Sequence, residues 1–534
     1  MPLAPQHTPR PMDRRAFLQY AACAAAATAL PRWAWSQSPA LQGDPFALGV
    51  ASGDPAPDGV VLWTRLVLAD PAQMQAAHTV RWEVAHDARF AQIVQKGEAP
   101  ALPLLGHSVH VELRGLAPGR WYHYRFMLGD AVSTVGRTRT APAAAELPGA
   151  LRVVFASCQR WEHGHYAAWH HAVADAPDLV LFLGDYIYEY ATPKNTADLA
   201  RTHSLRLATT LADYRDRYAL HKSDPALQAA HAACPWAVTW DDHEVQNDYA
   251  AGAGRGDADS FLALRAAAWQ AFYENMPLRA ASLGTPASAP RWDALQLYRR
   301  LRWGRLAHIH LLDSRQYRSW QACRTPQSMS AGAVRPADCA ELASPDRTLL
   351  GTAQEQWLHA GVAADARGHD GGAARWSVLA QQTLFSQRHY PSGVTSTDSW
   401  DGYPAARQRL LQAVSGHAPR NTVLLGGDIH QNYVCRVHAD PGRSESPVVA
   451  SEFCGTSISS RSSTTQDKVD AVARHNPHVL LARCDLRGYG LAEITPTRWT
   501  TTLRVVDDPL RADSGARTLA RFVVEDGRPG PQTA

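Results

Sequence analysis

The chain has 534 residues, of which 45% are hydrophobic and 19% charged, a composition typical of globular proteins and not of disordered ones. A chain of this length is expected to form more than one domain. The net charge is +3, and the first 36 residues account for all of it, with four arginines against one aspartate. The rest of the chain is therefore close to neutral. This gives no support to nucleic-acid recognition, because such domains usually carry a strong basic bias.

Residues 1–36 resemble a twin-arginine signal peptide. The pair Arg14-Arg15 precedes an apolar run from Ala21 to Leu30, and Ala34 and Ser36 place small residues at the −3 and −1 positions of a cleavage site. The apolar run is shorter than the roughly 20 residues that span a membrane, and no later stretch qualifies. We therefore expect export by the twin-arginine machinery, a periplasmic or secreted protein, and no stable membrane anchor. The alternative is a chance arginine pair before a buried helix.

Residues 44–142 carry short alternating apolar runs that are separated by turn residues. This pattern predicts a small all-β sandwich of the immunoglobulin or fibronectin type III kind. The Ala/Pro-rich stretch from Ala141 to Gly149 is the predicted linker to the next domain. The clearest runs are Gly59–Arg65, Thr79–Val84, His107–Leu113 and Trp121–Leu128.

From residue 150 to residue 515, apolar runs of four to eight residues alternate with helical patterns. This rhythm predicts an α/β domain with a mostly parallel sheet and covering helices. Ser260–Asn275 has helical spacing and is expected to end before Pro277. Gly488–Glu493 and Trp499–Val506 predict an antiparallel pair. The other expected strands are Leu151–Ala156, Leu179–Leu183, Ala237–Trp240, Leu306–Leu312, Trp376–Ala380 and Thr422–Leu425.

Polar residues directly follow almost every one of these apolar runs. Ligands of open α/β sheets bind beyond the carboxyl ends of the strands, so these residues are expected to meet in one crevice. A single aspartate after a strand is often only a helix cap, but a succession that includes His, Cys and Tyr favours a shared site. The polar segments are Ser157–Gln159, Gly184–Tyr188, Asp241–Glu244, Asp313–Arg318 and Gly426–His430.

The residue types in these segments predict a two-metal site for phosphoryl transfer. Asp185 is the natural carboxylate to bridge two cations, which together can hold the attacking and leaving oxygens. One metal position would be rich in thiolate, phenolate and imidazole donors, which suits Fe(III) better than Mg²⁺ or Ca²⁺. The other would offer only oxygen, which suits Ca²⁺. The donors are Cys158, Tyr188 and His430 at the first position, and Asp242, Asp428 and Asn247 at the second.

The order strand–Gly-Asp, strand–Asp-His-Glu and strand–Gly-Asp-x-His resembles the calcineurin-like metallophosphoesterase arrangement. Common members carry Asp-x-His after the first strand and His-x-His after the last. This chain has Ser157-Cys158-Gln159 and Asp428-Ile429-His430 instead, and these replacements resemble the PhoD-like alkaline phosphatase family. Leu48–Pro55 and Gly455–Ser460 are also similar to that family, and the resemblance covers roughly residues 44–506.

This resemblance implies a metallophosphoesterase-type layered α/β domain over residues 150–515, preceded by the small β-sandwich. It also implies an exported alkaline phosphatase or phosphodiesterase that hydrolyses phosphate mono- and diesters by metal-activated attack at phosphorus. The metals implied are Fe(III) on Cys158, Asp185, Tyr188 and His430, and one or two Ca²⁺ on Asp185, Asp242 and Asp428, with Asn247 as a further ligand.

Three further side chains are candidates for substrate chemistry. His243, next to Asp242, is placed to stabilise the transition state or protonate the leaving alkoxide, unless it only braces that aspartate. Arg160 or Arg315 is the candidate for bidentate contact with the substrate phosphate, and a structural salt bridge is the alternative for either.

Two other functions stay open at this stage. One is a phospholipase D-like or cell-wall-polymer phosphodiesterase that uses the same ligands. The other is a cell-surface binding protein with an inactive site, although the intact ligand set argues against decay.

Of the seven cysteines after the signal, Cys323 and Cys339 bracket a Pro/Ser/Ala-rich loop and are predicted to form a disulfide, and the other pairings stay open.

Overall fold

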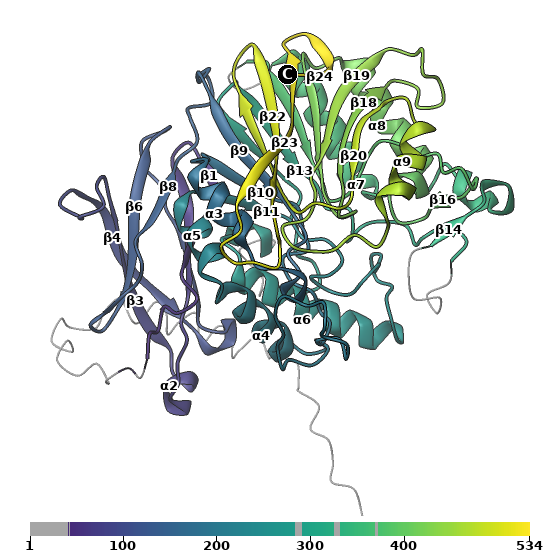
Figure 1. Ribbon diagram of the computed structural model, residues 1–534. Helices are drawn as coiled ribbons and strands as arrows, with labels where there is room; N and C mark the ends of the chain where they lie inside the picture. Colours follow the sequence, from purple (N-terminus) through teal and green to yellow (C-terminus); the bar gives the residue numbers. More distant parts are fainter. Residues whose placement is uncertain (1–40, 42, 284–290, 325–331, 369–371) are drawn as a thin grey trace, which may run out of the picture.

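The computed structural model describes residues 41, 43–283, 291–324, 332–368 and 372–534. Two large sheets lie face to face in these residues, and helices cover the outer face of each (Figure 1). The signal peptide predicted for residues 1–36 lies outside the described part of the chain. Within that part, no helix is both long and apolar enough to cross a membrane.

The first large sheet has ten strands and a parallel centre. β9, β10 and β11 run parallel to one another, and β21 joins β9 in the antiparallel sense. In spatial order the strands are β24 (Arg528–Thr533), β23 (Ala516–Glu525), β22 (Arg498–Val506), β21 (Gly488–Ile494), β9 (Leu151–Ala156), β10 (Leu179–Phe182), β11 (Trp236–Val238), β1 (Val50–Ala56), β2 (Gly59–Arg65) and β5 (Ser108–Glu112).

The second large sheet has seven strands. Four neighbours in it, β13, β15, β17 and β19, are parallel, and the strands at its edges are antiparallel. In order they are β12 (Arg299–Trp303), β13 (Ala307–Leu311), β15 (Trp376–Ala380), β17 (Thr422–Gly426), β19 (Val448–Cys454), β18 (Asn432–His438) and β20 (Val479–Arg483). A separate two-stranded sheet pairs β14 (Ala333–Val334) with β16 (Thr395–Ser396).

The N-terminal part adds an antiparallel sheet of its own, seen at the left of Figure 1. It consists of β4 (Ile93–Ala101), β3 (His78–Ala85), β6 (Trp121–Leu128) and β7 (Ala131–Val132), with β8 (Gly136–Arg139) paired to β6. A core that includes Val84, Val111 and Tyr124 joins this sheet to β1, β2 and β5.

The helices divide between the two outer faces. Side chains from α3, α4, α5 and α6 share a core with the ten-stranded sheet, and side chains from α7 and α8 share one with the seven-stranded sheet. Their bounds are α2 (Pro71–Gln75), α3 (Ala167–Ala174), α4 (Leu211–Lys222), α5 (Pro225–Ala233), α6 (Ala258–Asn275), α7 (Thr352–Arg367), α8 (Pro404–His417) and α9 (Gln466–Arg474).

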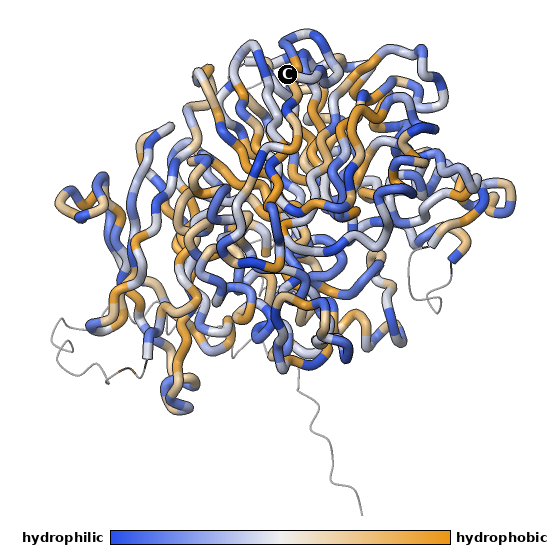
Figure 2. Tube along the Cα trace, viewed as in Figure 1, coloured by the Kyte–Doolittle hydropathy of each residue, from blue (hydrophilic) through white to orange (hydrophobic). Residues whose placement is uncertain are grey.

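The central strands are apolar on both faces because each face meets another layer. In β9, Val153 and Phe155 point into the core between the two sheets, while Val154 points into the core under the helices. Successive side chains of a strand alternate between faces, so a strand buried on both sides needs a continuous apolar run. Trp376 and Trp499 meet across the central core with ring centroids 5.7 Å apart. Figure 2 shows the apolar residues gathered along the sheet strands.

The layered α/β fold predicted from the sequence is confirmed, but the predicted single sheet is wrong. The runs at Leu151–Ala156 and Trp376–Ala380 form strands with the expected bounds, yet they lie in different sheets that face each other. Both arrangements bury the two faces of a strand, so the apolar pattern cannot tell which sheet a strand joins. The predicted helix begins two residues earlier, at Ala258, where Asp257 caps it.

The structure also differs from two of the predicted domain boundaries. One sheet of the predicted sandwich, β1–β2–β5, continues the ten-stranded sheet, because Gly53 pairs with Trp236 of β11. A Cβ on Gly53 would lie 2.8 Å from the carbonyl oxygen of Trp236 in β11, so a side chain would keep the two strands from meeting there. The α/β part extends past the predicted end at residue 515, since β23 pairs with β22. Most β23 side chains are partly or fully exposed, so its sequence carries little strand signal.

The predicted disulfide between Cys323 and Cys339 is present. The other described cysteines, Cys158, Cys234, Cys435, Cys454 and Cys484, are free and buried.

Candidate metal centre

Four strand-end loops meet at one edge of the two facing sheets. Cys158 follows β9, Asp185 follows β10, Asp242 follows β11, and Asp428 and His430 follow β17. The first two loops are joined by backbone bonds, since the Cys158 amide donates to the Gly184 carbonyl at 3.1 Å. The convergence predicted from the sequence is therefore what the fold produces, with the loops drawn from both sheets.

Four of the predicted ligands have left-handed backbone conformations. The φ angles are 59° at Cys158, 58° at Asp185, 64° at Asp428 and 55° at His430. This region costs a residue with a Cβ on the order of 1–3 kcal/mol, and such residues gather at functional sites where the surroundings hold them. The loops are thus shaped to turn these side chains inward at the expense of local stability.

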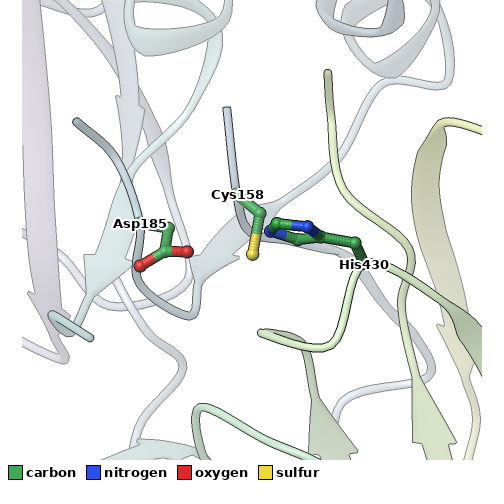
Figure 3. Close-up of side chains that lie close together, drawn as sticks. All are labelled: Cys158, Asp185 and His430. Atoms are coloured by element: carbon green, nitrogen blue, oxygen red, sulfur yellow. The ribbon is translucent and has the colours of Figure 1, made fainter. Parts of the chain in front are cut away.

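The first cluster brings Cys158, Asp185 and His430 together, with ligand atoms that all lie within 4.8 Å of one another. Figure 3 shows the Cys158 sulfur beside the Asp185 carboxylate and the His430 ring. The Tyr188 hydroxyl donates to Asp185 Oδ2 at 2.8 Å and lies 3.1 Å from His430 Nε2. His430 Nδ1 is 2.8 Å from the Arg461 carbonyl, which leaves Nε2 facing the cluster. One thiol, one phenol, one imidazole and one carboxylate therefore surround one point.

The second cluster consists almost entirely of carboxylates. Asp241, Asp242 and Asp428 offer oxygens that lie within 4.8 Å of one another, and a further group joins Asp242 and His243 to Asp185. Asp185 therefore belongs to the first cluster and, through this further group, adjoins Asp242 of the second, as a bridging carboxylate would. Asp241 was not predicted as a ligand, although it stands next to Asp242 directly after the same strand.

The charged forms of Asp185, Asp428 and Cys158 are destabilised by their surroundings, whereas Arg315 and His243 help to lower the pKa of Asp242. Burial raises the pKa of Asp185 well above its usual range, and its neighbours Asp242 and Asp428 add to the shift against the opposing charge of His243. Burial likewise raises the pKa of Asp428 to about 6 and that of Cys158 well above its ordinary value. Asp185 Oδ1 and Asp241 Oδ2 are buried and have no hydrogen-bond partner among the described residues.

This chemistry fits bound cations. Buried carboxylates that repel one another and leave oxygens without partners are stabilised by metal ions, which also favour the deprotonated thiol and phenol. The His430 ring fits as well, because burial lowers its pKa to about 3 and keeps it neutral, the form that binds metal. The described residues can thus hold metal ions at two adjoining positions.

Arg315 neutralises part of this negative charge. Its side chain is 1% exposed, its Nε donates to Asp241 Oδ1 at 2.5 Å, and its two Nη atoms donate to Asp398 at 2.8 Å each. Because these bonds fix the guanidinium inside the protein, Arg315 forms a structural salt bridge and does not reach a substrate. Asp398 was not predicted, since it lies 83 residues further along the chain.

Arg160 lies beside Tyr188 of the first cluster. Its guanidinium lies 5.7 Å from the Tyr188 ring centre and 5.2 Å from that of Tyr190. Its Nε donates to Glu162 at 3.3 Å, and no described residue accepts a hydrogen bond from its Nη atoms.

His243 stands over the site with its ring 4.1 Å from that of Tyr188. Its Nδ1 is 2.8 Å from Glu189 Oε2, and the Asn247 amide donates to the other oxygen of Glu189 at 3.0 Å. The side-chain amide of Asn247 donates to Asp248 at 2.6 Å, so Asn247 lies on the loop of the second cluster with its nitrogen turned away from a cation. Asn247 as a ligand stays a prediction.

Two further residues that the sequence analysis missed hold the loops in place. Glu244 is fully buried and accepts backbone hydrogen bonds from Asp185 at 3.0 Å and Asp241 at 2.8 Å, which ties the loops after β10 and β11 together. The Ser460 hydroxyl donates to the Tyr188 oxygen at 2.8 Å and orients it. Glu244 belongs to the Asp-His-Glu motif, but its partners are backbone amides, two of them on the loop after β10, which leave no sequence signal.

Gly184→Ala is expected to damage both stability and activity. Gly184 has φ +107°, and a Cβ there would lie 2.5 Å from the Asp241 Cβ. We expect a loss of more than about 1 kcal/mol in the free energy of unfolding, measured by urea titration, together with reduced turnover because both loops must shift. Gly416→Ala is the control, since Gly416 lies in α8 with open space around it. Equal stability of the two variants would contradict the close packing described.

Glu189→Gln is expected to lower kcat by about 10- to 100-fold with little change in KM, because Glu189 fixes the ring of His243. Steady-state kinetics on a phosphate monoester measures both constants. The partly exposed Glu493, on β21, provides a matched Glu→Gln control away from the site that should leave kcat unchanged. An unchanged kcat in Glu189→Gln would show that His243 needs no orientation from this carboxylate.

Comparison with known proteins agrees with this geometry. The sequence model of the family described as PhoD-like phosphatase matches residues 153–503, and that of its N-terminal domain matches residues 32–142. The chain belongs to the PhoD-like phosphatase family. It is 41% identical over 538 residues to alkaline phosphatase D of Bacillus subtilis (strain 168), which covers 97% of this chain and 88% of the relative. A solved structure of PhoD is 41% identical, has a TM-score of 0.85, and covers 93% of each chain.

Family membership agrees with the two clusters of potential metal ligands. The family resemblance inferred from the replacements at Cys158 and Asp428 is confirmed, as is the layered fold. The matched segments include every residue of both clusters. The chain is therefore a phosphoric ester hydrolase by family, with a site that can hold metal ions.

Proposed function

We propose that the protein is an exported alkaline phosphatase that hydrolyses phosphate mono- and diesters at the strand-end site. The observation that carries this proposal is the place of Asp185 between two adjoining clusters of potential metal ligands, grouped with Cys158 and His430 on one side and with Asp242 on the other. Paired cations about 3.5–4 Å apart are a recurring device for phosphoryl transfer, because they hold the attacking and leaving oxygens in line.

The donor sets support different metals at the two positions. Cys158, Tyr188 and His430 with Asp185 would hold Fe(III), since thiolate and phenolate donors favour a strongly Lewis-acidic ion. Asp242 and Asp428 with Asp185, joined by Asn247 or by Asp241, would hold one or two Ca²⁺, which prefer oxygen ligands. When bound, these ions would supply charge neutralisation for the phosphate and lower the pKa of water.

The chain's own side chains supply the remaining steps. The free Nη atoms of Arg160 are placed to donate two parallel hydrogen bonds to phosphate oxygens. His243 is held at Nδ1 by Glu189, so its Nε2 is the atom that can donate a proton to the leaving alkoxide or stabilise its charge. Phosphoryl transfer depends mainly on positioning and electrostatic stabilisation, which these groups provide.

Export to the periplasm or the outside of the cell rests on the twin-arginine pattern at Arg14-Arg15 and the apolar run after it. The partners proposed are therefore the twin-arginine machinery and phosphate ester substrates, with no nucleic acid and no membrane anchor.

Hydrolysis of p-nitrophenyl phosphate beside bis-p-nitrophenyl phosphate tests this function, at alkaline pH with Ca²⁺, before and after chelation. We expect cleavage of the monoester and its loss on chelation, while the ratio of the two rates measures the preference for diesters. Cleavage of the diester alone would favour a phosphodiesterase of lipids or cell-wall polymers. Cleavage of neither ester by iron-loaded protein would favour the binding-protein alternative.

A further inference from the structure

A cavity of about 230 Å³ lies away from the metal centre. Its lining comes from the loop after β15, from α8, from the end of β18 and from the loops around residues 441–444 and 477–478. β18 begins two residues after His430 and ends at His438, which lines the cavity. At about 3.3 Å per residue, the strand separates the two sites by roughly 20 Å.

The lining of this cavity is basic. It contains two arginines, Arg407 and Arg436, and three histidines, His389, His438 and His478, but no acidic residue. Burial lowers the pKa of His478 and so favours its neutral ring, and His438, His389 and Arg407 each lower it further, which shows that these groups lie close to one another. A cleft lined by one sign of charge concentrates ions of the opposite sign.

One of the two arginines has no acidic partner among the described residues. Arg407 is buried and donates to Asp401 Oδ1 at 2.6 Å, which neutralises it. Arg436 is exposed, and its guanidinium makes no hydrogen bond or ion pair with any described residue. Asp440, the acidic residue nearest to Arg436 in sequence, accepts from the Gly442 amide with Oδ1 at 2.9 Å, and Glu452 on the neighbouring strand accepts from the Phe385 and Ser386 amides. The cavity therefore carries one positive charge that lacks a partner.

The histidines that line the cavity are held by hydrogen bonds that use only one ring nitrogen of His478 and of His438. His478 Nε2 is 3.1 Å from the Gln387 carbonyl, and His438 Nδ1 is 2.7 Å from the Ser446 carbonyl. Asn476 is fully buried and bonds to both the amide and the carbonyl of His389. Each of the first two rings thus donates through one nitrogen and keeps the other as an acceptor.

This combination matches a protonated phosphate group. Its anionic oxygens can accept from the Arg436 guanidinium in a bidentate arrangement, and its own O–H can donate to a neutral imidazole nitrogen. Sulfate carries a similar charge but has no proton to donate at neutral pH. We propose that this cavity is a second, non-catalytic binding site for a phosphate group, carried by inorganic phosphate or by a small phosphate monoester.

Calorimetric titration of the metal-loaded protein with inorganic phosphate tests the site. Wild-type protein is expected to bind two phosphates, one at the metal centre and one in the cavity, and chelation should remove only the first. Arg436→Glu should lower the affinity of the second site by at least about tenfold, the worth of one hydrogen bond to a charged group, and leave phosphate inhibition of hydrolysis unchanged. Sulfate should not compete for this second site.

Arg443→Glu is the matched control, because Arg443 is exposed on the adjoining loop, pairs with Glu445, and does not line the cavity. It should retain two phosphates. Titration with methylphosphonate, a stable analogue of a monoester, separates the two sources: tighter binding than inorganic phosphate would identify an ester as the ligand. The proposal is overturned if chelated wild-type protein binds no phosphate, or if Arg436→Glu and Arg443→Glu weaken the second site equally. The site does not depend on hydrolysis, so an inactive metal centre would leave this test intact.

Discussion

Asp185→Asn is expected to reduce kcat/KM for phosphate monoesters by about 10³-fold or more. Asp185 is 1% exposed and is the carboxylate that links the first ligand cluster to Asp242 of the second. Asparagine keeps its size but offers one neutral oxygen, so neither metal position would keep its charge balance. Removal of a single charge-stabilising group from an active site typically costs about 10²–10³-fold, and this residue serves two positions. Steady-state kinetics with a monoester and a diester measures the loss.

The same variant is expected to be the more stable protein when metal is absent. Asp185 is buried beside Asp242, Glu244 and Asp428, so its negative charge costs stability unless a cation is bound. Thermal unfolding after chelation at alkaline pH should therefore give a higher Tm for Asp185→Asn than for wild type, and metal should reverse the order. Asp440→Asn, on an exposed loop, controls for the loss of a surface charge. A variant that is active, or that is the less stable protein without metal, would contradict the bridging role.

Acid is expected to destabilise the protein steeply below pH 6.5 because of two buried histidines. His221 is 1% exposed, and burial lowers its pKa to about 3. His231 is 3% exposed, stacks on Trp236 with ring centres 3.8 Å apart, and has its pKa lowered by burial and by Lys222. In the unfolded chain each takes up a proton near pH 6.5, whereas in the folded protein each stays neutral.

The sign of the effect follows from proton uptake. Between pH 6.5 and the lowered pKa values the unfolded state binds more protons than the folded state, so stability is complete above pH 6.5 and is lost as the pH falls. At pH 5 each histidine should cost roughly 2 kcal/mol of the free energy of unfolding. His221→Gln and His231→Gln should each flatten the slope of stability against pH, whatever they do to stability at pH 8.

Urea titrations between pH 5 and pH 8 measure that slope. His475→Gln is the control, because His475 is exposed at the end of α9 and should leave the slope as it is. Unchanged slopes in both His221→Gln and His231→Gln would show that protonation of other groups causes the acid destabilisation.

The strand-end ligands could be predicted from the sequence because each follows a continuous apolar run. Cys158 lies two residues after β9, and Asp428 lies two residues after β17. Locating the strands in the sequence therefore also located these ligands. The same runs could not show that β9 and β17 belong to different sheets, because a strand buried on both faces has one pattern in either setting.

The supporting residues could not be predicted, because their partners are distant in sequence. Glu189 holds His243 from 54 residues away, and Asp398 holds Arg315 from 83 residues away. Nothing in the local pattern around Asp398 distinguishes it from an aspartate of a surface loop. Arg315 illustrates the converse, since its place after a strand made it a substrate candidate until its contacts showed a buried ion pair.

The metal content of the purified protein, measured beside its activity, tests the central claim most directly. Elemental analysis by mass spectrometry on wild type and Asp185→Asn should find about one iron and one or two calcium ions per wild-type chain. Both metals should fall in the variant, and activity should follow their occupancy through chelation and reloading. Full phosphatase activity in protein that holds neither metal would contradict the metal centre proposed here.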